Sequence, residues 1–132
     1  MVSFFHSNRL TFVVMGFLLE YWWILASFFI LFFVMRRIGG ERGVNYKDQI
    51  EKGAIILDVR THSEFSSGHI ENSVNMPLGK LEGTFEELDV NKPVITVCAM
   101  GGRAEKAKKI LISKGFKVHN GGGWKNLEKK IK

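Results

Sequence analysis

The sequence predicts an α/β domain with a small central parallel sheet flanked by helices, preceded by one transmembrane helix. Two observations lead to this fold class. Residues 1–40 hold eight of the eleven Phe and only four charged side chains, while residues 41–132 hold the other 28 charges. In the charged part, short continuous apolar runs alternate with helical patterns, and such runs are typical of parallel strands buried on both faces.

Residues 10–35 are the predicted transmembrane helix. They form a run of 26 residues in which Glu20 is the only ionisable side chain, and a spanning helix needs about 20 residues. A cleaved secretory signal is the alternative, but the run is too long for one and no small-x-small cleavage site precedes Arg36. We therefore expect a retained anchor that follows an N-terminal tail, residues 1–9.

The basic residues on either side of this run predict its orientation. Only Arg9 precedes the run, whereas Arg36, Arg37 and three further basic side chains follow it closely. Positively charged flanks are retained in the cytoplasm. The expected localisation is a single-pass membrane protein with its N-terminus outside and its domain in the cytoplasm, a reducing compartment that suits a lone cysteine.

Glu20 calls for a physical account, because a carboxylate inside a bilayer is costly. Gly16, Glu20, Trp23 and Ser27 are spaced by four, three and four residues, so a helix places them on one face. Small and polar residues on one face are how membrane helices associate, which predicts a homo-oligomer or a membrane partner. The alternative is a protonated or water-bridged Glu20 near the membrane interface.

The linker, residues 36–43, is glycine-rich, and residues 44–132 are long enough for one domain with a single small core. A short helical pattern covers residues 46–51. A continuous apolar run of strand length covers residues 54–57, and a helical turn closed by a glycine covers residues 63–67.

The middle of the domain continues the alternation. Residues 73–76 are expected to form a short strand before a proline, and residues 78–88 a helix weakened by a glycine at its centre. A proline opens the buried strand at residues 94–97. Residues 103–114 carry apolar side chains along one side and lysines in the last turns, which is typical of a helix packed against a sheet.

The end of the domain adds a third main strand at residues 116–118 and a closing helix at residues 124–131. In open parallel sheets the reactive crevice lies outside the carboxyl ends of the strands. Two predicted strands end there on chemically useful side chains, Asp58 after the first and Cys98 after residues 94–97.

Cys98 has surroundings that suit an anionic sulfur. Gly101 and Gly102 allow the backbone to curl so that successive amides point inward, and the helix that starts at Arg103 directs its positive end to the same place. A sulfur held there is favoured as the nucleophilic thiolate. The alternative is that a lone cysteine at the end of a buried strand is a small core side chain.

The pattern Cys98-x-x-Gly101-x-Arg103 resembles the active-site loop of rhodanese-type sulfurtransferases. A second set of residues, in the order and spacing of that family's N-terminal signature, is Asp58, Arg60, Glu64, Phe65, Gly68, His69, Ile70, Ser73, Asn75 and Pro77. The resemblance covers most of residues 44–128. Ala104, Ser73 and Leu127 depart from it, since Ser, Ala and an aromatic residue are more usual there, which affects substrate preference more than reaction class.

The resemblance implies that Cys98 accepts sulfane sulfur from thiosulfate or a persulfide and passes it to a thiol or a cyanide-like acceptor, without a cofactor. The anion of the Cys98 persulfide would be held by the loop Ala99, Met100, Gly101, Gly102 and Arg103. The Arg103 side chain would either order the loop or bind an anionic donor. Asp58 and Arg60 match supporting positions, and Glu64 and His69 are expected to make local hydrogen bonds.

The spacing within the cysteine loop separates this chemistry from phosphate hydrolysis. Related phosphatase domains have five residues between Cys and Arg, and this chain has four between Cys98 and Arg103. A single Cys and four scattered His give no disulfide framework and no metal-ligand spacing. We therefore expect neither a metal nor phosphatase activity.

The formal net charge of +6 divides into +2 for residues 1–40 and +4 for residues 41–132, too little in either part to predict nucleic-acid binding. Ten of the basic residues lie within residues 103–132 against two acidic ones. They are expected to form a solvated face, although an acidic sulfur-carrier protein or anionic lipid could bind them.

The sequence is compatible with three functions. The first is a membrane-anchored sulfurtransferase. The second is a persulfide or redox sensor in which oxidation of Cys98 is reported through the membrane helix. The third is a protein-binding module that uses the fold without chemistry, against which the presence of both Cys98 and Arg103 argues.

Overall fold

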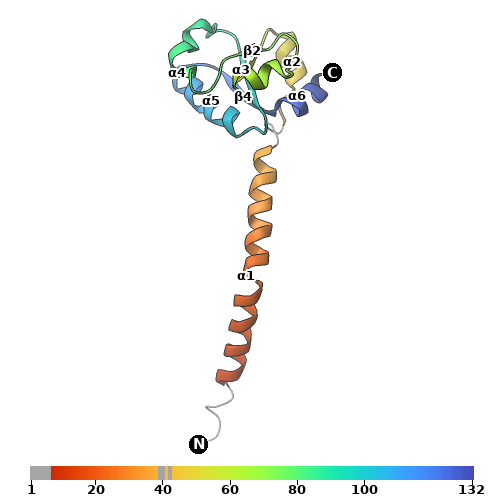
Figure 1. Ribbon diagram of the computed structural model, residues 1–132, viewed down its shortest axis with the longest axis vertical. Helices are drawn as coiled ribbons and strands as arrows, with labels where there is room; N and C mark the ends of the chain where they lie inside the picture. The colour runs from red at the N-terminus through yellow and green to blue at the C-terminus, as the bar shows by residue number, and fades with distance from the viewer. Residues whose placement is uncertain (1–6, 39–40, 42) are drawn as a thin grey trace, which may run out of the picture. The chain divides into compact units, whose positions relative to one another are not determined.

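The computed structural model describes residues 7–38, 41 and 43–132 (Figure 1). The chain divides into two compact units, residues 1–35 and residues 36–132. The first unit is built on one long helix and the second is an α/β domain.

Helix α1 (Ser7–Ile38) is 32 residues long, so the helix expected at residues 10–35 forms and extends slightly at both ends. Its side chains are described for residues 16 and 21–35. There Phe29 and Phe33 pack one turn apart, with ring centroids 5.5 Å apart, and the hydroxyl of Ser27 donates to the carbonyl of Ile24. The Glu20 side chain lies outside the described set.

Over the residues that the structure describes, no helix combines the length and the apolar character that crossing a membrane requires. The membrane anchor expected at residues 10–35 is therefore not supported by the structure.

The sheet of the domain has four parallel strands in the order β2-β1-β3-β4. The strands are β1 (Ile55–Asp58), β2 (Val74–Asn75), β3 (Val94–Cys98) and β4 (Val118–Gly123). All five residues of β3, the strand between β1 and β4, are buried. The carboxyl ends of β1 and β3 therefore lie side by side, with Asp58 paired in register with Val97.

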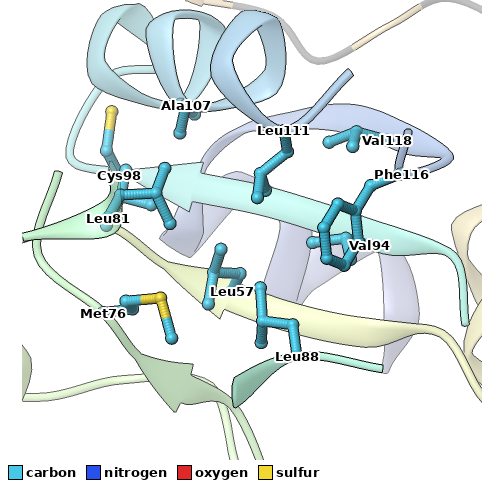
Figure 2. Packing of buried hydrophobic residues seen from close by; sticks show 12 residues of the cluster. Leu57, Met76, Leu81, Leu88, Val94, Cys98, Ala107, Leu111, Phe116 and Val118 are labelled. Atoms are coloured by element: carbon cyan, nitrogen blue, oxygen red, sulfur yellow. The ribbon is translucent and has the colours of Figure 1, made fainter. Parts of the chain in front are cut away.

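Two hydrophobic clusters cover the two faces of the sheet. One contains Leu57 and Val94 from the strands and is closed by α4 (Leu81–Thr84), the 3₁₀ turn η1 (Phe85–Glu87) and α5 (Gly102–Ser113). Figure 2 shows Cys98 in this cluster, with Ala107 and Leu111 of α5 packed over the strands. Because side chains alternate along a strand, Cys98 shares its face with Val94.

The second cluster contains Ile56, Ile95 and Val97 from the strands. It is covered by α2 (Tyr46–Glu51) through Tyr46 and by α6 (Trp124–Ile131) through Leu127. The remaining helix, α3 (His62–Ser66), follows β1. The α/β class with a parallel sheet flanked by helices is thus confirmed.

Most predicted elements form within a residue or two of their expected ends, but two expectations were wrong. The strand expected at residues 116–118 instead runs from Val118 to Gly123, through three glycines of low strand propensity that are held by hydrogen bonds to β3. The single helix expected at residues 78–88 is two short turns, α4 and η1, since glycine weakens the helix interior.

Candidate functional site

Cys98 is the last residue of β3, and its side chain is almost completely buried, with 2% of the residue exposed. The amide of Gly101 donates a hydrogen bond to its sulfur, with an N–S distance of 3.0 Å. Core packing by Leu81 and Ala107 holds the residue in the same cluster as the strand side chains. The sulfur is therefore held by core packing on one side and by the Gly101 amide of the loop on the other.

The loop after Cys98 turns directly into α5. Gly101 has a φ of 99°, in the left-handed region that side chains with a Cβ rarely adopt. This conformation points the Gly101 amide back to the sulfur, and α5 begins at the next residue. The Gly101 amide and the positive end of the α5 dipole thus lie next to the sulfur, where they stabilise negative charge on it or on an attached atom.

The end of β4 supports this loop from the neighbouring strand. Cys98 is paired in register with Gly123, and a Cβ added to Gly123 would lie only 2.9 Å from the carbonyl oxygen of Ala99. One strand position earlier, the amide of Gly122 donates to the Asn120 side-chain oxygen at 2.8 Å. Asn120 itself donates through Nδ2 to the carboxylate of Glu105 at 2.9 Å, which ties β4 to the first turn of α5.

Arg103 is held by Glu64 through a two-bond ion pair. Its Nη1 donates to Oε2 and its Nη2 to Oε1, each at 2.7 Å. The hydrogen bonds that Arg103 donates to Glu64 raise the pKa of Arg103, with Cys98 contributing further, and the Arg103 guanidinium holds the pKa of Glu64 well below its usual range. The side chain is thus an ordering element that joins α5 to α3.

Glu64 has a second role in its own helix. It forms a capping box with Thr61, whose hydroxyl accepts from the Glu64 amide while the Glu64 carboxylate accepts from the Thr61 amide at 2.9 Å. The same carboxylate therefore closes the start of α3 and binds Arg103. This agrees with the expected local hydrogen bonding and adds a contact to the cysteine loop that spacing did not reveal.

Asp58 and Arg60 form a buried ion pair at the end of β1. Asp58 is fully buried and Arg60 is 4% exposed, and Nη2 of Arg60 donates to Oδ2 of Asp58 at 2.6 Å. Arg60 also donates to the carbonyls of Glu64 at 3.1 Å and Gly68 at 2.7 Å, and its guanidinium lies 4.6 Å from the ring of Trp124. The pair braces α3, the helix that presents Glu64.

Comparison with known proteins identifies this arrangement. Residues 44–130 match the family model described as the rhodanese-like domain. The chain belongs to the rhodanese-like family. The thiosulfate sulfurtransferase GlpE of Pseudomonas syringae pv. syringae is 35% identical over 66 residues, which cover 50% of this chain and 62% of that relative. The chain thus spans about three fifths of the relative's length.

Solved structures with the same fold include reduced Bacillus anthracis CoADR-RHD. That match has a TM-score of 0.56 and 35% identity, and covers 62% of this chain and 15% of the other. A rhodanese with anions from E. coli matches with a TM-score of 0.53 and 28% identity, covering 56% of this chain and 91% of the other.

The rhodanese-like domain brings most of the sequence-predicted site residues together. Cys98 and Gly101 are buried, while Ala99, Met100 and Gly102 are exposed and Arg103 is half-buried, so the outer rim of the loop faces solvent. Asp58, paired in register with Val97 next to Cys98, binds Arg60.

His69 makes the local contacts that were expected of it. It stacks on Phe65, with ring centroids 3.9 Å apart, and its Nδ1 lies 3.0 Å from the Phe65 carbonyl oxygen.

Two of the departures from the family pattern have a packing explanation in this rhodanese-like domain. Leu127 is completely buried in the cluster under β3, so a leucine fills the space available there. Ala104 is also completely buried, and its carbonyl accepts from the hydroxyl of Thr96 at 3.0 Å.

Proposed function

We propose that this chain is a rhodanese-type sulfurtransferase that carries sulfane sulfur as a persulfide on Cys98. The observation that carries the proposal is the Gly101 amide, which donates to the Cys98 sulfur at the start of α5. The Pseudomonas relative is named a thiosulfate sulfurtransferase, which supports the same reaction class. The E. coli rhodanese of the same fold was solved with anions, which supports an anion-binding loop.

The proposed reaction has two displacements at sulfur. The Cys98 thiolate attacks the outer sulfur of the donor, a new S–S bond forms, and the donor's own bond to that sulfur breaks with the electron pair leaving on the donor fragment. A thiol or cyanide-like acceptor then attacks the outer sulfur of the persulfide. The Cys98 thiolate leaves with the bonding electrons and is ready for another cycle.

The loop supplies the electrostatic part of this chemistry. The backbone amides from Ala99 to Arg103 would surround the outer sulfur, where negative charge resides in the persulfide. Arg103 keeps the loop in place through Glu64. Asp58 and Arg60 act as supporting residues, because their buried pair braces the helix that carries Glu64.

Intact mass spectrometry of the full chain tests the proposal. After exposure to thiosulfate or a small persulfide, the chain should gain the mass of one sulfur, cyanide should remove it, and Cys98→Ser should gain none. Absence of the gain with every donor would contradict the proposal. A persulfide that forms but transfers to no thiol acceptor would favour the sensing alternative.

On the sequence alone, we also propose the placement and partners of the domain. Residues 1–9 would be a tail, residues 10–35 a membrane anchor, residues 36–43 a linker and residues 44–132 the cytoplasmic catalytic domain. The length of α1, 32 residues, is compatible with a span. Carbonate extraction of membranes that contain the full chain tests the anchor, since a peripheral protein would be released.

Two macromolecular contacts belong to the same proposal. The face of Gly16, Glu20, Trp23 and Ser27 would mediate self-association of the helix. The basic residues of α5 and α6 would receive an acidic sulfur-carrier protein, in which case binding weakens steeply as salt is added.

A further inference from the structure

The glycine turn that directs an amide at Cys98 needs support from outside itself. Gly101 and Gly102 have no side chains, and glycine loses more conformational freedom on ordering than any other residue. Among the side chains that the structure describes, two hydrogen-bond to the backbone of residues 99–102. One is Cys98, whose sulfur accepts from the Gly101 amide, and the other is Asn120 of β4, whose Nδ2 donates to the Gly101 carbonyl at 3.4 Å.

A β-bulge in β4 lies directly after Asn120. The register of β4 against β3 shifts there by one residue, which leaves Gly121 as the extra residue. Asn120 pairs with Thr96, whose hydroxyl donates to the Ala104 carbonyl of α5. Directly paired residues present their side chains on the same face of a sheet, so Asn120 also faces α5. Bulges beside active sites often direct a side chain in this way.

The polar atoms of the Asn120 side chain have partners of the matching kind. Its Oδ1 accepts from the Gly122 amide at 2.8 Å, which closes the bulge. Its Nδ2 donates to the Glu105 carboxylate at 2.9 Å as well as to the Gly101 carbonyl. The residue is 7% exposed, so water competes little for these hydrogen bonds. The side chain thus joins the bulge, the first turn of α5 and the glycine turn between β3 and α5.

The backbone of Asn120 is held at the outer edge of the sheet, where β4 is the last strand. Its carbonyl accepts from the Glu41 amide at 3.0 Å and from the Tyr46 hydroxyl at 2.8 Å. Its amide donates to the Glu41 carboxylate at 3.3 Å. A residue whose backbone is already fixed can order a flexible neighbour, because it has little conformational entropy of its own left to lose.

The Gly101 carbonyl is the point through which Asn120 acts on the loop. This carbonyl also accepts from the Glu105 amide at 3.0 Å, so it is held by one donor from α5 and by another from β4. The Gly101 amide is joined to it through a single Cα, so holding the carbonyl limits rotation of the amide away from the sulfur. In a planar trans peptide the direction of the Gly102 amide is fixed by the same carbonyl.

We propose that Asn120 is a positioning residue for sulfur transfer, because it holds the Gly101 carbonyl and thereby keeps the Gly101 amide on the Cys98 sulfur. This inference rests on the proposed sulfurtransferase function and assigns it a residue 19 positions along the chain from the turn. No bond forms or breaks at Asn120. Its effect is on negatively charged sulfur, which a hydrogen-bond donor stabilises in the thiolate and in the persulfide.

The test is the pH profile of Cys98 alkylation by iodoacetamide in the full chain, measured by intact mass spectrometry. Cys98 is the single cysteine and iodoacetamide does not ionise, so the profile reports the thiolate. Asn120→Leu is nearly isosteric and removes the donor. Thr96→Val is the matched control, because it removes an equally buried hydroxyl that bonds carbonyls of α5 and β4 but leaves Gly101 untouched.

Asn120→Leu should move the midpoint of the profile to higher pH by about half a unit or more, and slow sulfur loading at neutral pH by about fivefold. Asn120→Ser should shift both in the same direction, because its hydroxyl is too short to replace the bond to Gly101. It serves as the second variant if the leucine variant fails to fold. Thr96→Val should be less stable in urea unfolding but keep the midpoint of the unsubstituted chain.

The charged side chains around the loop are the same in all of these variants. They lie on three elements: Arg103 and Glu105 on α5, Glu64 on α3, and Asp58 with Arg60 at the end of β1. Arg103 interacts with Cys98 in each of them, so its influence on the profile cancels in the comparison. Glu105 is the charge that Asn120 contacts. Glu105→Gln removes this charge, keeps an oxygen that accepts from Asn120, and should not move the midpoint to higher pH.

An unchanged midpoint in both Asn120 variants would overturn the inference, as would an equal shift in Thr96→Val. In either case sulfur loading of the unsubstituted chain would still support the proposed function. If no donor loads the unsubstituted chain, the proposed function itself fails, while the alkylation profiles still show whether Asn120 holds the Gly101 amide on the sulfur. The two failures are therefore distinguishable.

Discussion

Arg103 and Glu64 lie 39 positions apart in the chain and form an ion pair with two hydrogen bonds of 2.7 Å. Each side chain is about one third exposed, 35% for Arg103 and 38% for Glu64. Solvent screening at this exposure limits the pair's contribution to folding, so its main effect is geometric. It joins the start of α3 to the start of α5 and thereby holds the loop that carries the Gly101 amide.

Glu64→Gln should therefore slow sulfur loading more than it lowers stability. A glutamine cannot accept from both guanidinium nitrogens, so Arg103 loses its fixed position and the loop loses order. We expect loading to fall by about tenfold and the free energy of unfolding by about 1 kcal/mol. Rapid-quench loading and urea unfolding measure the two effects, with Glu71→Gln, an exposed carboxylate, as the control. A loss of stability without a loss of rate would contradict this role.

The same pair makes stability depend on pH in the acid range. Arg103 is the main cause that lowers the pKa of Glu64 below its ordinary value of 4.5. A carboxyl whose pKa is lower in the folded state stabilises the fold above its unfolded pKa, and this contribution is lost as pH falls below about 4.5. The stability difference between the unsubstituted chain and Glu64→Gln should thus shrink between pH 6 and pH 3. A constant difference in urea unfolding would argue against the pair.

The buried pair of Asp58 and Arg60 should contribute more to stability than to rate. Asp58 accepts from Nε and Nη2 of Arg60 at 2.9 and 2.6 Å, and both residues are buried. Asp58→Asn leaves a buried cation without its counter-charge, a change that costs about 3–5 kcal/mol. Urea unfolding measures this loss. Asp48→Asn, which removes the acid of an exposed pair with Lys52, should cost about 1 kcal/mol or less.

Sulfur loading by the fraction of Asp58→Asn that remains folded tests whether Asp58 acts only on the fold or also in the reaction. A normal rate would identify a structural residue, as its complete burial against Arg60 suggests. A rate reduced as strongly as in Cys98→Ser would place Asp58 in the chemistry instead.

The sequence was sufficient to predict the parts of the site that depend on short-range geometry. Cys98 at the end of a buried strand, the glycine turn and the helix that follows are all set by neighbouring residues, and each forms where expected. Burial of β1 and β3 on both faces also follows from their continuous apolar runs.

Contacts between distant segments could not be predicted in the same way. The capping box of Thr61 and Glu64 could be read from their spacing, but nothing local indicates that the Glu64 carboxylate also binds Arg103. The strand β4 was placed too early because its glycines have low intrinsic strand propensity. Its pairing with β3 outweighs that propensity, and only the assembled sheet reveals that Asn120 ties it to α5.

Glu41 should anchor the beginning of the domain to β4 and α5. Its amide donates to the Asn120 carbonyl at 3.0 Å, and its carboxylate binds Lys108 and His119. Burial opposes ionisation of this carboxyl, but the hydrogen bonds from Lys108 and His119 outweigh it and lower its pKa. Glu41→Ala should therefore speed amide exchange at residues 41 and 120 by about fivefold, with a stability loss near 1 kcal/mol.

Hydrogen exchange followed by mass spectrometry would measure this effect. Glu51→Ala, an exposed carboxylate in the last turn of α2, is the matched control and should leave exchange at residue 120 unchanged. Equal exchange in the Glu41→Ala and unsubstituted chains would show that the carboxylate does not hold this segment in place.

Gly123 and Gly121 provide a matched pair of substitutions in β4 that separates damage to the loop from damage to the core. A Cβ on Gly123 would lie 2.9 Å from the Ala99 carbonyl oxygen, so Gly123→Ala must displace the backbone of the cysteine loop. A Cβ on Gly121 would lie 3.0 Å from side chains of Ile95, Val97 and Leu127, so Gly121→Ala overpacks the core instead. Overpacking of this kind costs about 1–3 kcal/mol.

Both variants should be less stable in urea unfolding. At a temperature where each is folded, only Gly123→Ala should show a rate of sulfur loading reduced by more than about tenfold. The reason is that Ala99 lies directly after Cys98, so a shift of its carbonyl also moves the Gly101 amide off the sulfur. Gly102→Ala, where an added Cβ meets nothing within 4 Å, should load at nearly the rate of the unsubstituted chain. Equal loading in Gly121→Ala and Gly123→Ala would mean that the loop tolerates displacement, and the backbone donor would then lose its assigned role.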